Sequence, residues 1–297
     1  GIDSLIGDVR HHEHFETSLT EFQPEVVFHL AAQPLVRDSY EIPRETYETN
    51  VMGTVNLLEA VRHSESVRSV VVVTTDKVYE NKEWHWGYRE NDRLGGYDPY
   101  SNSKAAAELA VAAYRSSFFN PNTYGKEHNV AVATARAGNV IGGGDWAVDR
   151  IVPDLMRAWL EKTSGMIRNP YAVRPWQHVL EPLSGYLVLA ERLYESVEYA
   201  EEWNFGPRDI DCIPVGELVD LFEEQCNGLK IDRGTSSGPH EAAILKLDTS
   251  KSESLLRWRP RWAVRRAVIQ VTDEYAKLAD GRGDLRGSIY SYLETGL

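Results

Sequence analysis

Three apolar runs of strand length, separated by segments with helical spacing, constrain the fold of this chain more than any other feature. The runs cover residues 25–32, 70–75 and 129–136. A strand covered on both faces reads as such a continuous run rather than as an alternating pattern. Parallel strands also need crossover connections, which are usually helices. The alternation therefore predicts a doubly wound α/β protein built on a parallel sheet.

The rest of the chain extends this alternation and then departs from it. We expect a short strand at 4–8 before the first helix. The predicted helices span 11–22, 44–63, 100–118, 152–162, 182–196, 215–226, 249–256 and 264–279. After residue 146 the pattern becomes irregular and rich in Arg, Trp and Pro, which favours a second, interwoven lobe. We expect 1–145 with 176–204 to form one domain, and 146–175 with 205–297 to form the smaller one.

Size and composition exclude several classes of protein. A chain of 297 residues, 42% hydrophobic and 26% charged, has the make-up of a globular protein with a sizeable core. It contains neither the roughly 18-residue apolar stretch of a membrane span nor a signal peptide. The net charge of −13 argues against a nucleic-acid partner, which would require a basic face. Cys212 and Cys226 form no disulfide framework, which favours a reducing cytoplasm.

Polar residues gather where the predicted strands end, at 30–33, 74–77 and 136–139. In a parallel sheet, ligands bind outside these carboxyl ends. Tyr100 and Lys104 follow on one face of a predicted helix, four residues apart. There the ammonium can lower the phenol pKa, so that the pair acts as a proton-transfer unit. A solvated Lys beside a packed Tyr would give the same spacing, and only the strand-then-helix context favours the chemistry.

These features together resemble the extended short-chain dehydrogenase/reductase superfamily. The shared segments are 28–32 (FHLAA), 46–54 (TYETNVMGT), 74–76 (TTD), 100–104 (YxxxK) and 136–139 (RAGN). Within it, the chain is similar to the CDP-glucose 4,6-dehydratases. That similarity rests on 32–36 (AQPLV), 75–79 (TDKVY), 136–146, 174–182 (RPWQHVLEP), 204–207 (NFGP) and 246–251 (KLDTSK). It implies a Rossmann-type fold, NAD as cofactor and the conversion of CDP-D-glucose to CDP-4-keto-6-deoxy-D-glucose, for deoxysugar and O-antigen synthesis.

The resemblance also assigns catalytic roles. Tyr100 would take the proton of the sugar 4-hydroxyl, while Lys104 holds the nicotinamide ribose and keeps Tyr100 anionic. Thr75 would donate a hydrogen bond to the 4-oxygen, and Asp76 would protonate the departing 6-hydroxyl. Lys77 stands where related dTDP-glucose dehydratases carry Glu, so it either takes the C5 proton or only stabilises the enolate.

Binding residues follow from the same resemblance. Asn50 is expected to position a helix or a backbone carbonyl rather than to react, and Arg174 is the expected diphosphate ligand because its planar fork suits phosphate oxygens. The cofactor-binding residues implied are Asp8, Val9, Leu30, Ala31, Ala32, Gln33, Asn50, Thr74, Tyr100 and Lys104. The substrate-binding residues implied are Asn139, Arg150, Arg174, Asn204 and Arg208.

One departure from the family concerns its amino-terminal part. The family carries a Gly-rich loop between its first strand and first helix, which holds the cofactor pyrophosphate. This chain has no such segment, and Gly142–Gly144 follows the wrong strand to replace it. We therefore expect a fragment of a longer dehydratase, with residues 26–31 left as an apolar sheet edge and with weakened NAD binding.

Other features have simpler interpretations. His11, His12 and His14 fit a polar helix face better than a metal site, and we expect no metal. Trp258 and Trp262 fit packing with cation–π contacts. The resemblance implies a homodimer or homotetramer paired through the helices at 50–63 and 100–118. There an apolar stripe on the second helix would fit a subunit interface or a core face equally. The stripe comprises Leu109, Ala110, Ala113 and Tyr114.

Two other functions remain open from the sequence. One is a nucleotide-sugar epimerase or reductase of the same superfamily, which would not need an acid at Asp76. The other is a catalytically inactive binding or interaction module that has lost its cofactor.

Overall fold

The computed structural model describes residues 2–234 and 242–295. The chain divides into two compact units, and it passes between them repeatedly. The first comprises Gly1–Asn81, Glu90–Arg136 and Tyr186–Asn204. The second comprises Lys82–Arg89, Ala137–Gly185 and Phe205–Leu297. Residues 82–89, 137–145 and 176–185, which we expected in the first lobe, fall in the second unit in this division.

The first unit contains a sheet of four strands in the order β1-β2-β3-β7. These are β1 (Val26–His29), β2 (Ser69–Val73), β3 (Ala131–Ala137) and β7 (Glu202–Phe205). β1 pairs in parallel with β2, and β2 pairs in parallel with β3. The predicted α/β fold with a parallel sheet is confirmed, and the carboxyl ends of the three predicted strands lie at one edge of this sheet.

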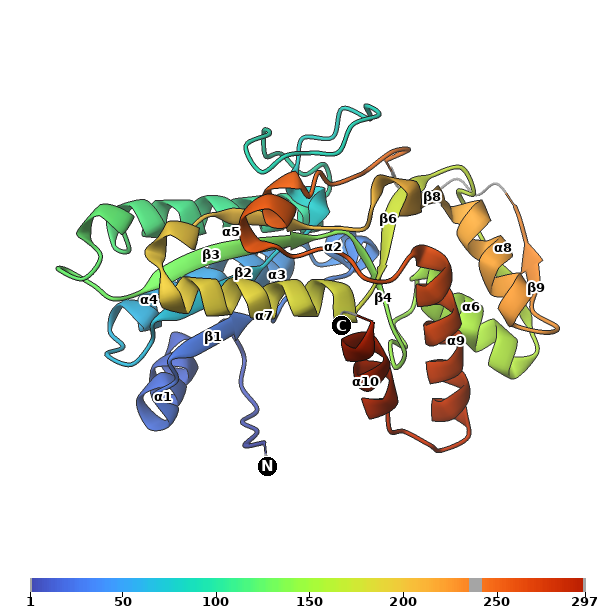
Figure 1. The fold of residues 1–297 in the computed structure, drawn as a ribbon, viewed down its shortest axis with the longest axis horizontal. Coiled ribbons are helices and arrows are strands. Elements are labelled where there is room, and N and C mark those ends of the chain that lie inside the picture. Colours follow the sequence, from blue (N-terminus) through green and yellow to red (C-terminus); the bar gives the residue numbers. More distant parts are fainter. Residues whose placement is uncertain (1, 235–241, 296–297) are drawn as a thin grey trace. The chain divides into compact units, whose positions relative to one another are not determined.

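Helices cover both faces of this sheet (Figure 1). On one face, Leu57, Leu58 and Val111 pack against Val70 and Val72. On the other face, Ser69 Oγ donates to the Ala190 carbonyl of α7 at 3.0 Å. The helices are α1 (His12–Phe22), α2 (Val36–Glu41), α3 (Pro43–Tyr47), a π-helix (Glu48–Met52), α4 (Gly53–Arg62), α5 (Pro99–Ser117) and α7 (Leu180–Glu195), of which the last begins in the second unit. Short 3₁₀ helices lie at Asp76–Val78, Pro121–Thr123 and Val197–Tyr199.

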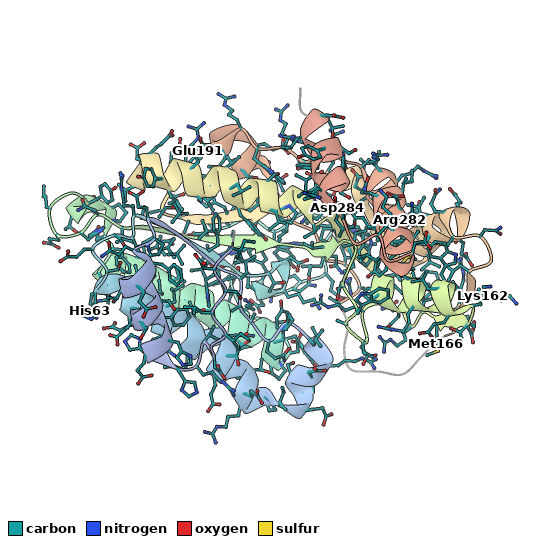
Figure 2. The ribbon with its side chains drawn as sticks, turned by 90° about the horizontal axis from the view of Figure 1, so that it is seen from below. His63, Lys162, Met166, Glu191, Arg282 and Asp284 are labelled. Carbon is teal, nitrogen blue, oxygen red and sulfur yellow. The ribbon has the colours of Figure 1, made fainter. Side chains whose placement is uncertain are left out.

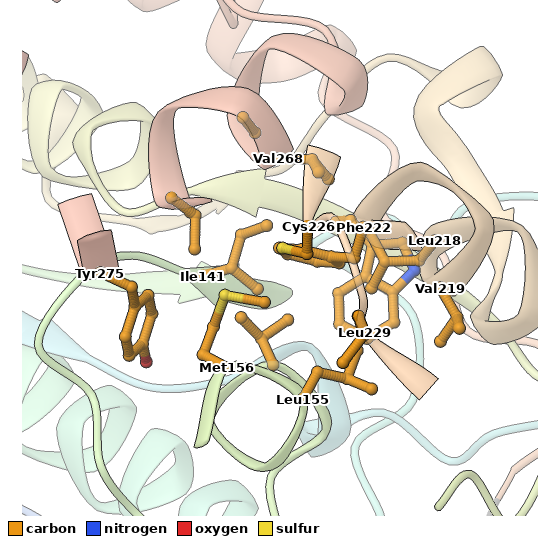
Figure 3. Close-up of a cluster of buried hydrophobic side chains, with 14 of the residues drawn as sticks. Ile141, Leu155, Met156, Leu218, Val219, Phe222, Cys226, Leu229, Val268 and Tyr275 are labelled. Carbon is orange, nitrogen blue, oxygen red and sulfur yellow. The ribbon is translucent and has the colours of Figure 1, made fainter. Parts of the chain in front are cut away.

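The second unit has two small sheets and its own core. Its strands are β4 (Asn139–Ile141), β5 (Ser164–Met166), β6 (Val173–His178), β8 (Cys212–Pro214) and β9 (Lys230–Asp232), ordered β4-β6-β8 and β5-β9. Its helices are α6 (Ile151–Glu161), a 3₁₀ helix (Asp209–Asp211), α8 (Val215–Gln225), a π-helix (Ser252–Leu256), α9 (Val264–Ala279) and α10 (Arg286–Glu294). Figure 3 shows the core that α6, α8 and α9 form with Met156, Phe222 and Val268.

Many charged side chains lie on the outside, where they remain solvated. Glu191 in the first unit and Arg282 and Asp284 in the second are exposed (Figure 2). Among the described residues, no helix has the length and apolar character needed to cross a membrane.

Three expectations about elements need correction. The strand expected at 4–8 is absent, because Leu5 and Ile6 are exposed and no strand pairs with this segment. The helix expected at 44–63 is interrupted by the π-helix at Glu48–Met52. The helix expected at 249–256 is π-helical from Ser252 onward.

Candidate active site

The first part of the candidate site is the turn that follows β2. Thr74 still belongs to the sheet hydrogen bonding, since its N–H donates to the Ala135 carbonyl at 2.8 Å. Thr75 then caps the short 3₁₀ helix: its hydroxyl accepts from Lys77 N at 3.4 Å and donates to Asp76 Oδ1 at 3.1 Å. Asp76 is buried and Lys77 is half-buried. One turn therefore carries a hydroxyl, a carboxyl and an ammonium in succession.

The second part is the start of α5. Asp98 caps this helix by accepting from Ser101 N at 2.9 Å and from Ser101 Oγ at 2.6 Å, and Pro99 occupies the first position, where its missing N–H costs nothing. Tyr100 and Lys104 lie one turn apart and are both buried. Lys104 Nζ donates to the Val73 carbonyl at 3.0 Å, at the last residue of β2. The helix thus brings its ammonium directly beside the Thr74–Lys77 turn.

Burial controls the charge of Lys104. Desolvation lowers its pKa to about 8, and the Glu108 carboxylate opposes this by favouring the cation. An ammonium with a pKa near neutral carries its charge at neutral pH but can lose it readily. Lys104 is therefore well suited to take part in proton transfer.

Asn50 connects the end of β1 to α5. Its Oδ1 accepts from Gln33 N at 2.8 Å, and its Nδ2 donates to the Gln33 carbonyl at 3.1 Å and to Ser103 Oγ at 2.9 Å. It lies within the π-helix, a distortion that often marks functional sites. Through these contacts the Asn50 amide holds the Gln33 backbone in place.

The remaining residues expected at the cofactor lie in two places. Leu30 and Ala31 directly after β1 are exposed, and Ala32 and Gln33 are half-buried. Asp8 is paired with Arg10 at 2.6 Å, and that hydrogen bond lowers the Asp8 pKa. Val9 lies next to Asp8, and its carbonyl accepts from Asn56 Nδ2 at 3.0 Å.

The residues expected at the substrate are distributed over both units. Asn204 lies in the first unit, whereas Asn139, Arg150, Arg174 and Arg208 lie in the second. Arg174 is buried and donates to the carbonyls of Val173 and Ala242, at 2.9 and 2.6 Å. Arg150 is paired with Asp145 at 3.0 Å, and Arg208 is exposed.

Sequence reasoning missed a buried ion pair behind this site. Arg136 donates to both carboxylate oxygens of Glu108 at 2.9 Å, and each side chain is only 3% exposed. Thr74 and Thr134 hydroxyls also donate to Glu108, at 2.5 and 2.7 Å. Burial alone would raise the Glu108 pKa, but Arg136 and these hydrogen bonds hold it below its usual value. The available signal was Glu108 itself, one turn after Lys104 on the same helix face.

His29 is a second missed residue. It ends β1, is 5% exposed, and packs its ring against Phe15. Burial, with a contribution from Lys104, lowers its pKa to about 4, so it is neutral at physiological pH. Its position within the 28–32 motif was visible in the sequence, but its burial was not.

The other features singled out in the sequence have ordinary contacts. His12 pairs with Glu16 at 3.1 Å, and His14 Nδ1 accepts from Asp8 N at 3.1 Å. No cluster of three potential metal ligands occurs in the part of the chain that the structure describes. Trp262 makes a cation–π contact with Arg266, which lies over its ring at 5.4 Å, whereas the neighbouring Arg261 lies over the Tyr292 ring at 4.8 Å. Cys226 belongs to the core, and burial raises its pKa to about 11.

Comparison with known proteins defines the class to which this fold and site belong. A family model described as GDP-mannose 4,6 dehydratase matches residues 2–271. The chain belongs to this family of NAD-dependent nucleotide-sugar dehydratases, within the extended short-chain dehydrogenase/reductase superfamily. The chain is thus a member of a hydro-lyase family.

Individual relatives narrow the comparison. The chain is 56% identical over 268 residues to the CDP-glucose 4,6-dehydratase of Salmonella typhimurium, covering 89% of this chain and 74% of that protein. Solved structures confirm the Rossmann-type fold. A dTDP-glucose 4,6-dehydratase from Bacillus anthracis, in complex with NAD, has a TM-score of 0.76 at 23% identity and covers 93% and 80% of the two chains. A UDP-glucose 4-epimerase from Thermotoga maritima, with UDP-glucose, has a TM-score of 0.77 at 20% identity and covers 92% and 84%.

Proposed function

We propose that this chain dehydrates CDP-D-glucose to CDP-4-keto-6-deoxy-D-glucose with NAD as cofactor. The observation that carries the proposal is the turn after β2, where Thr75, Asp76 and Lys77 follow in succession beside the buried Lys104. A carboxyl and an ammonium at this place suit an elimination of water. The 56% identity to a CDP-glucose 4,6-dehydratase supports the substrate.

The steps of the reaction must occur in a particular order. The C5 hydrogen of a hexose is not acidic until C4 has become a ketone, so oxidation must come before elimination. NAD, when bound, supplies this redox chemistry by accepting a hydride from C4 and returning it to C6. The protein side chains then have to move protons at the 4-hydroxyl, at C5 and at the 6-hydroxyl.

Each proton has a candidate group. Tyr100 takes the 4-hydroxyl proton, assisted by the Lys104 cation. Thr75 donates a hydrogen bond to the 4-oxygen. Asp76, which is buried, protonates the departing 6-hydroxyl, for which its carboxyl must begin neutral.

Lys77 is the candidate for the C5 proton. It can act as a base only in its neutral form, which a nearby cation would favour. Alternatively, it remains charged and stabilises the developing enolate, while another group removes the proton. Both roles are compatible with the position of Lys77 on the turn. The rate at which the C5 hydrogen exchanges with deuterated water distinguishes them.

The residues present fit the nicotinamide end of NAD. The Lys104 ammonium has three donors and directs one to Val73 O, so donors remain for ribose hydroxyls. Tyr100 lies in the same buried helix turn, and Leu30–Gln33 and Thr74 follow the adjacent strand ends. Asn50 would act indirectly, by fixing the Gln33 backbone.

Substrate binding is assigned to arginines and amides of the second unit, with Asn204 from the first. Arg174 would bind the diphosphate, with Asn139, Arg150 and Arg208 assisting. In this structure Arg174 is buried and donates to the carbonyls of Val173 and Ala242, and its planar guanidinium has the geometry that suits phosphate oxygens. We assign NAD binding to the first unit and nucleotide-sugar binding to the second.

The biological setting is part of the same proposal. We propose a cytoplasmic enzyme that supplies deoxysugars for surface polysaccharides such as O-antigen. We also propose that it forms a homodimer or homotetramer through α4 and α5, where Leu109 on α5 and Phe118 directly after it are exposed. Sedimentation of wild type and Leu109→Glu tests this, and an unchanged oligomer would exclude that face.

The direct test is incubation with CDP-glucose and NAD⁺, followed by the absorbance of the 4-keto product in alkali. Product from CDP-glucose supports the proposal. Product from another nucleotide sugar alone would overturn the substrate. Epimerised or reduced sugar instead of a 6-deoxy product would indicate an epimerase or reductase, and no NAD⁺ binding would indicate a non-catalytic module.

The role of Lys77 requires a separate measurement. In deuterated water, a C5 base exchanges the C5 hydrogen of the keto intermediate with solvent. Lys77→Met should reduce this exchange by at least a hundredfold if Lys77 is that base. Exchange near the wild-type rate would leave Lys77 an electrostatic role only.

A further inference from the structure

The segment from Thr74 to Tyr79, which carries Asp76 and Lys77, is hydrogen-bonded at both of its ends to the buried Glu108–Arg136 ion pair. Its first residue, Thr74, donates through its hydroxyl to Glu108 Oε1 at 2.5 Å. Its last, Tyr79, accepts through its hydroxyl from Arg136 at 2.8 Å. Glu108 and Arg136 bind each other through two hydrogen bonds of 2.9 Å. The backbone from 74 to 79 therefore closes a loop through these four side chains.

This arrangement exceeds what packing alone requires. A buried Arg–Glu pair is costly to desolvate and often adds little to stability. Here further hydrogen bonds extend from the pair. Arg136 also donates to the Glu90 carbonyl at 2.9 Å, and the Tyr79 hydroxyl, which accepts from Arg136, donates to Asn204 at 2.8 Å. A planar guanidinium that binds a carboxylate by two bonds fixes direction as well as distance.

The pair also reaches the second catalytic element. Glu108 lies one helical turn after Lys104 on α5, and its carboxylate favours the Lys104 cation. Lys104 in turn donates to the Val73 carbonyl, directly before Thr74. Any shift of the pair would therefore move the turn after β2 relative to the Lys104 ammonium.

We propose that Glu108 and Arg136 are positioning residues that hold the Thr74–Tyr79 turn, and with it Asp76 and Lys77, in register with Lys104. The proposal rests on the proposed dehydratase function for its kinetic consequences. Neither residue touches substrate; both act through Thr74 and Tyr79. Displacements of about 1 Å at a catalytic group can lower the rate a hundredfold.

Tyr79→Phe is the test, because it removes one hydroxyl and keeps the ring. We expect kcat to fall about tenfold or more, with a smaller change in KM. Amide hydrogen exchange in 74–79, measured without substrate, should become at least several times faster. Tyr194→Phe is the matched control: it lies on α7 and loses a hydroxyl bond to Glu25 of 2.8 Å, outside the turn. It should leave both measurements near wild type.

The outcomes are distinct. Unchanged exchange and kcat in a folded Tyr79→Phe would overturn the proposal, and a rise in KM alone would assign Tyr79 to the Asn204 side of the site instead. If Tyr79→Phe does not fold, Thr134→Val removes one donor to Glu108, and Thr134→Ser should restore the wild-type exchange in 74–79. No loss in Thr134→Val would also overturn the proposal. Inactive wild type would refute the dehydratase function, while the exchange measurement would still decide the positioning role.

Discussion

At the residue scale, the candidate site separates two carboxyl groups by their surroundings. Glu108 is held ionised by two hydrogen bonds from the Arg136 guanidinium and by the hydroxyls of Thr74 and Thr134, so it cannot serve as an acid. Asp76 is buried at the start of a 3₁₀ helix and accepts from Thr75. A carboxylate that is held ionised by a guanidinium cannot deliver a proton, so Asp76 is the remaining candidate for the acid of this site. Asp76 is therefore the group whose removal should block elimination selectively.

Replacing Asp76 by Asn tests this separation. The amide fits the site but cannot deliver a proton to the 6-hydroxyl, so 4-keto-6-deoxy product should fall by a hundredfold or more. Oxidation at C4 and exchange at C5 precede that step, so solvent deuterium should still enter C5. Mass spectrometry of recovered sugar measures both. Asp284→Asn, at an exposed position, is the control. Equal loss of exchange and product in Asp76→Asn would contradict the assignment.

The burial of His29 predicts that the free energy of unfolding depends on pH. Its pKa is about 4 in the folded chain and near 6.5 when unfolded. Between these values the unfolded chain binds the extra proton, so folding stability must decrease as pH falls from about 6.5 to 4. One pKa unit corresponds to about 1.4 kcal/mol, so this residue should contribute a loss of about 2–3 kcal/mol by pH 4.5.

His29→Leu isolates that contribution. Urea unfolding of both proteins at pH 7 and pH 4.5 gives the stability lost on acidification. Wild type should lose about 2–3 kcal/mol more than the variant, because the variant has no imidazole to protonate. Equal losses would show that His29 is already protonated, or readily so, in the folded chain.

At the scale of elements, the amino-terminal cap of α5 determines where Tyr100 lies. Asp98 satisfies the Ser101 N–H and hydroxyl, and Tyr100 is in the same first turn. Asp98→Ala should lower the free energy of unfolding by about 0.5–2 kcal/mol, and kcat should fall as the first turn frays. Asp98→Asn keeps the accepting oxygen and should retain most of the free energy of unfolding and most of kcat. Urea unfolding and steady-state kinetics check this, and a stable but slow Asp98→Asn would indicate that charge matters more than capping.

The elements that the sequence predicted well are those with an unambiguous physical signal. β2 and β3 are buried on both faces and therefore read as continuous apolar runs. The start of α5 carries an Asp-Pro capping signal. The six other strands, β4 to β9, were not assigned because each has six residues or fewer and several contain Pro or charged residues. Their pairing depends on distant partners that local spacing does not reveal.

The candidate site was predictable to the same extent. Residues at strand ends and on one helix face, such as Asp76 and Lys104, follow from the order of elements. The contacts of Glu108 with Arg136 join residues 28 apart and depend on how α5 packs against β3. The π-helix that holds Asn50 was also invisible, because its composition fits an ordinary helix.

At the scale of the whole molecule, the chain forms two units with separate cores, and each unit is built from segments that are not contiguous in the sequence. Leu58 belongs to the core of the first unit and Phe222 to that of the second. Since the chain passes repeatedly between the units, neither is a continuous segment that could be excised. A ligand that binds folded protein stabilises it by mass action, whichever residues hold the ligand. NAD⁺ binding should therefore be measurable as a stability change of the intact chain.

This gives a prediction that decides between an enzyme and a non-catalytic module. NAD⁺ at a hundred times its dissociation constant, as measured by isothermal titration, should raise the free energy of unfolding by about 2.7 kcal/mol. Lys104→Met should shift the midpoint less at the same concentration, because it removes the ammonium expected at the ribose. Lys126→Met, at an exposed position, should respond like wild type. If neither titration nor unfolding detects NAD⁺ at millimolar concentration, the module hypothesis prevails for this chain; micromolar binding excludes it.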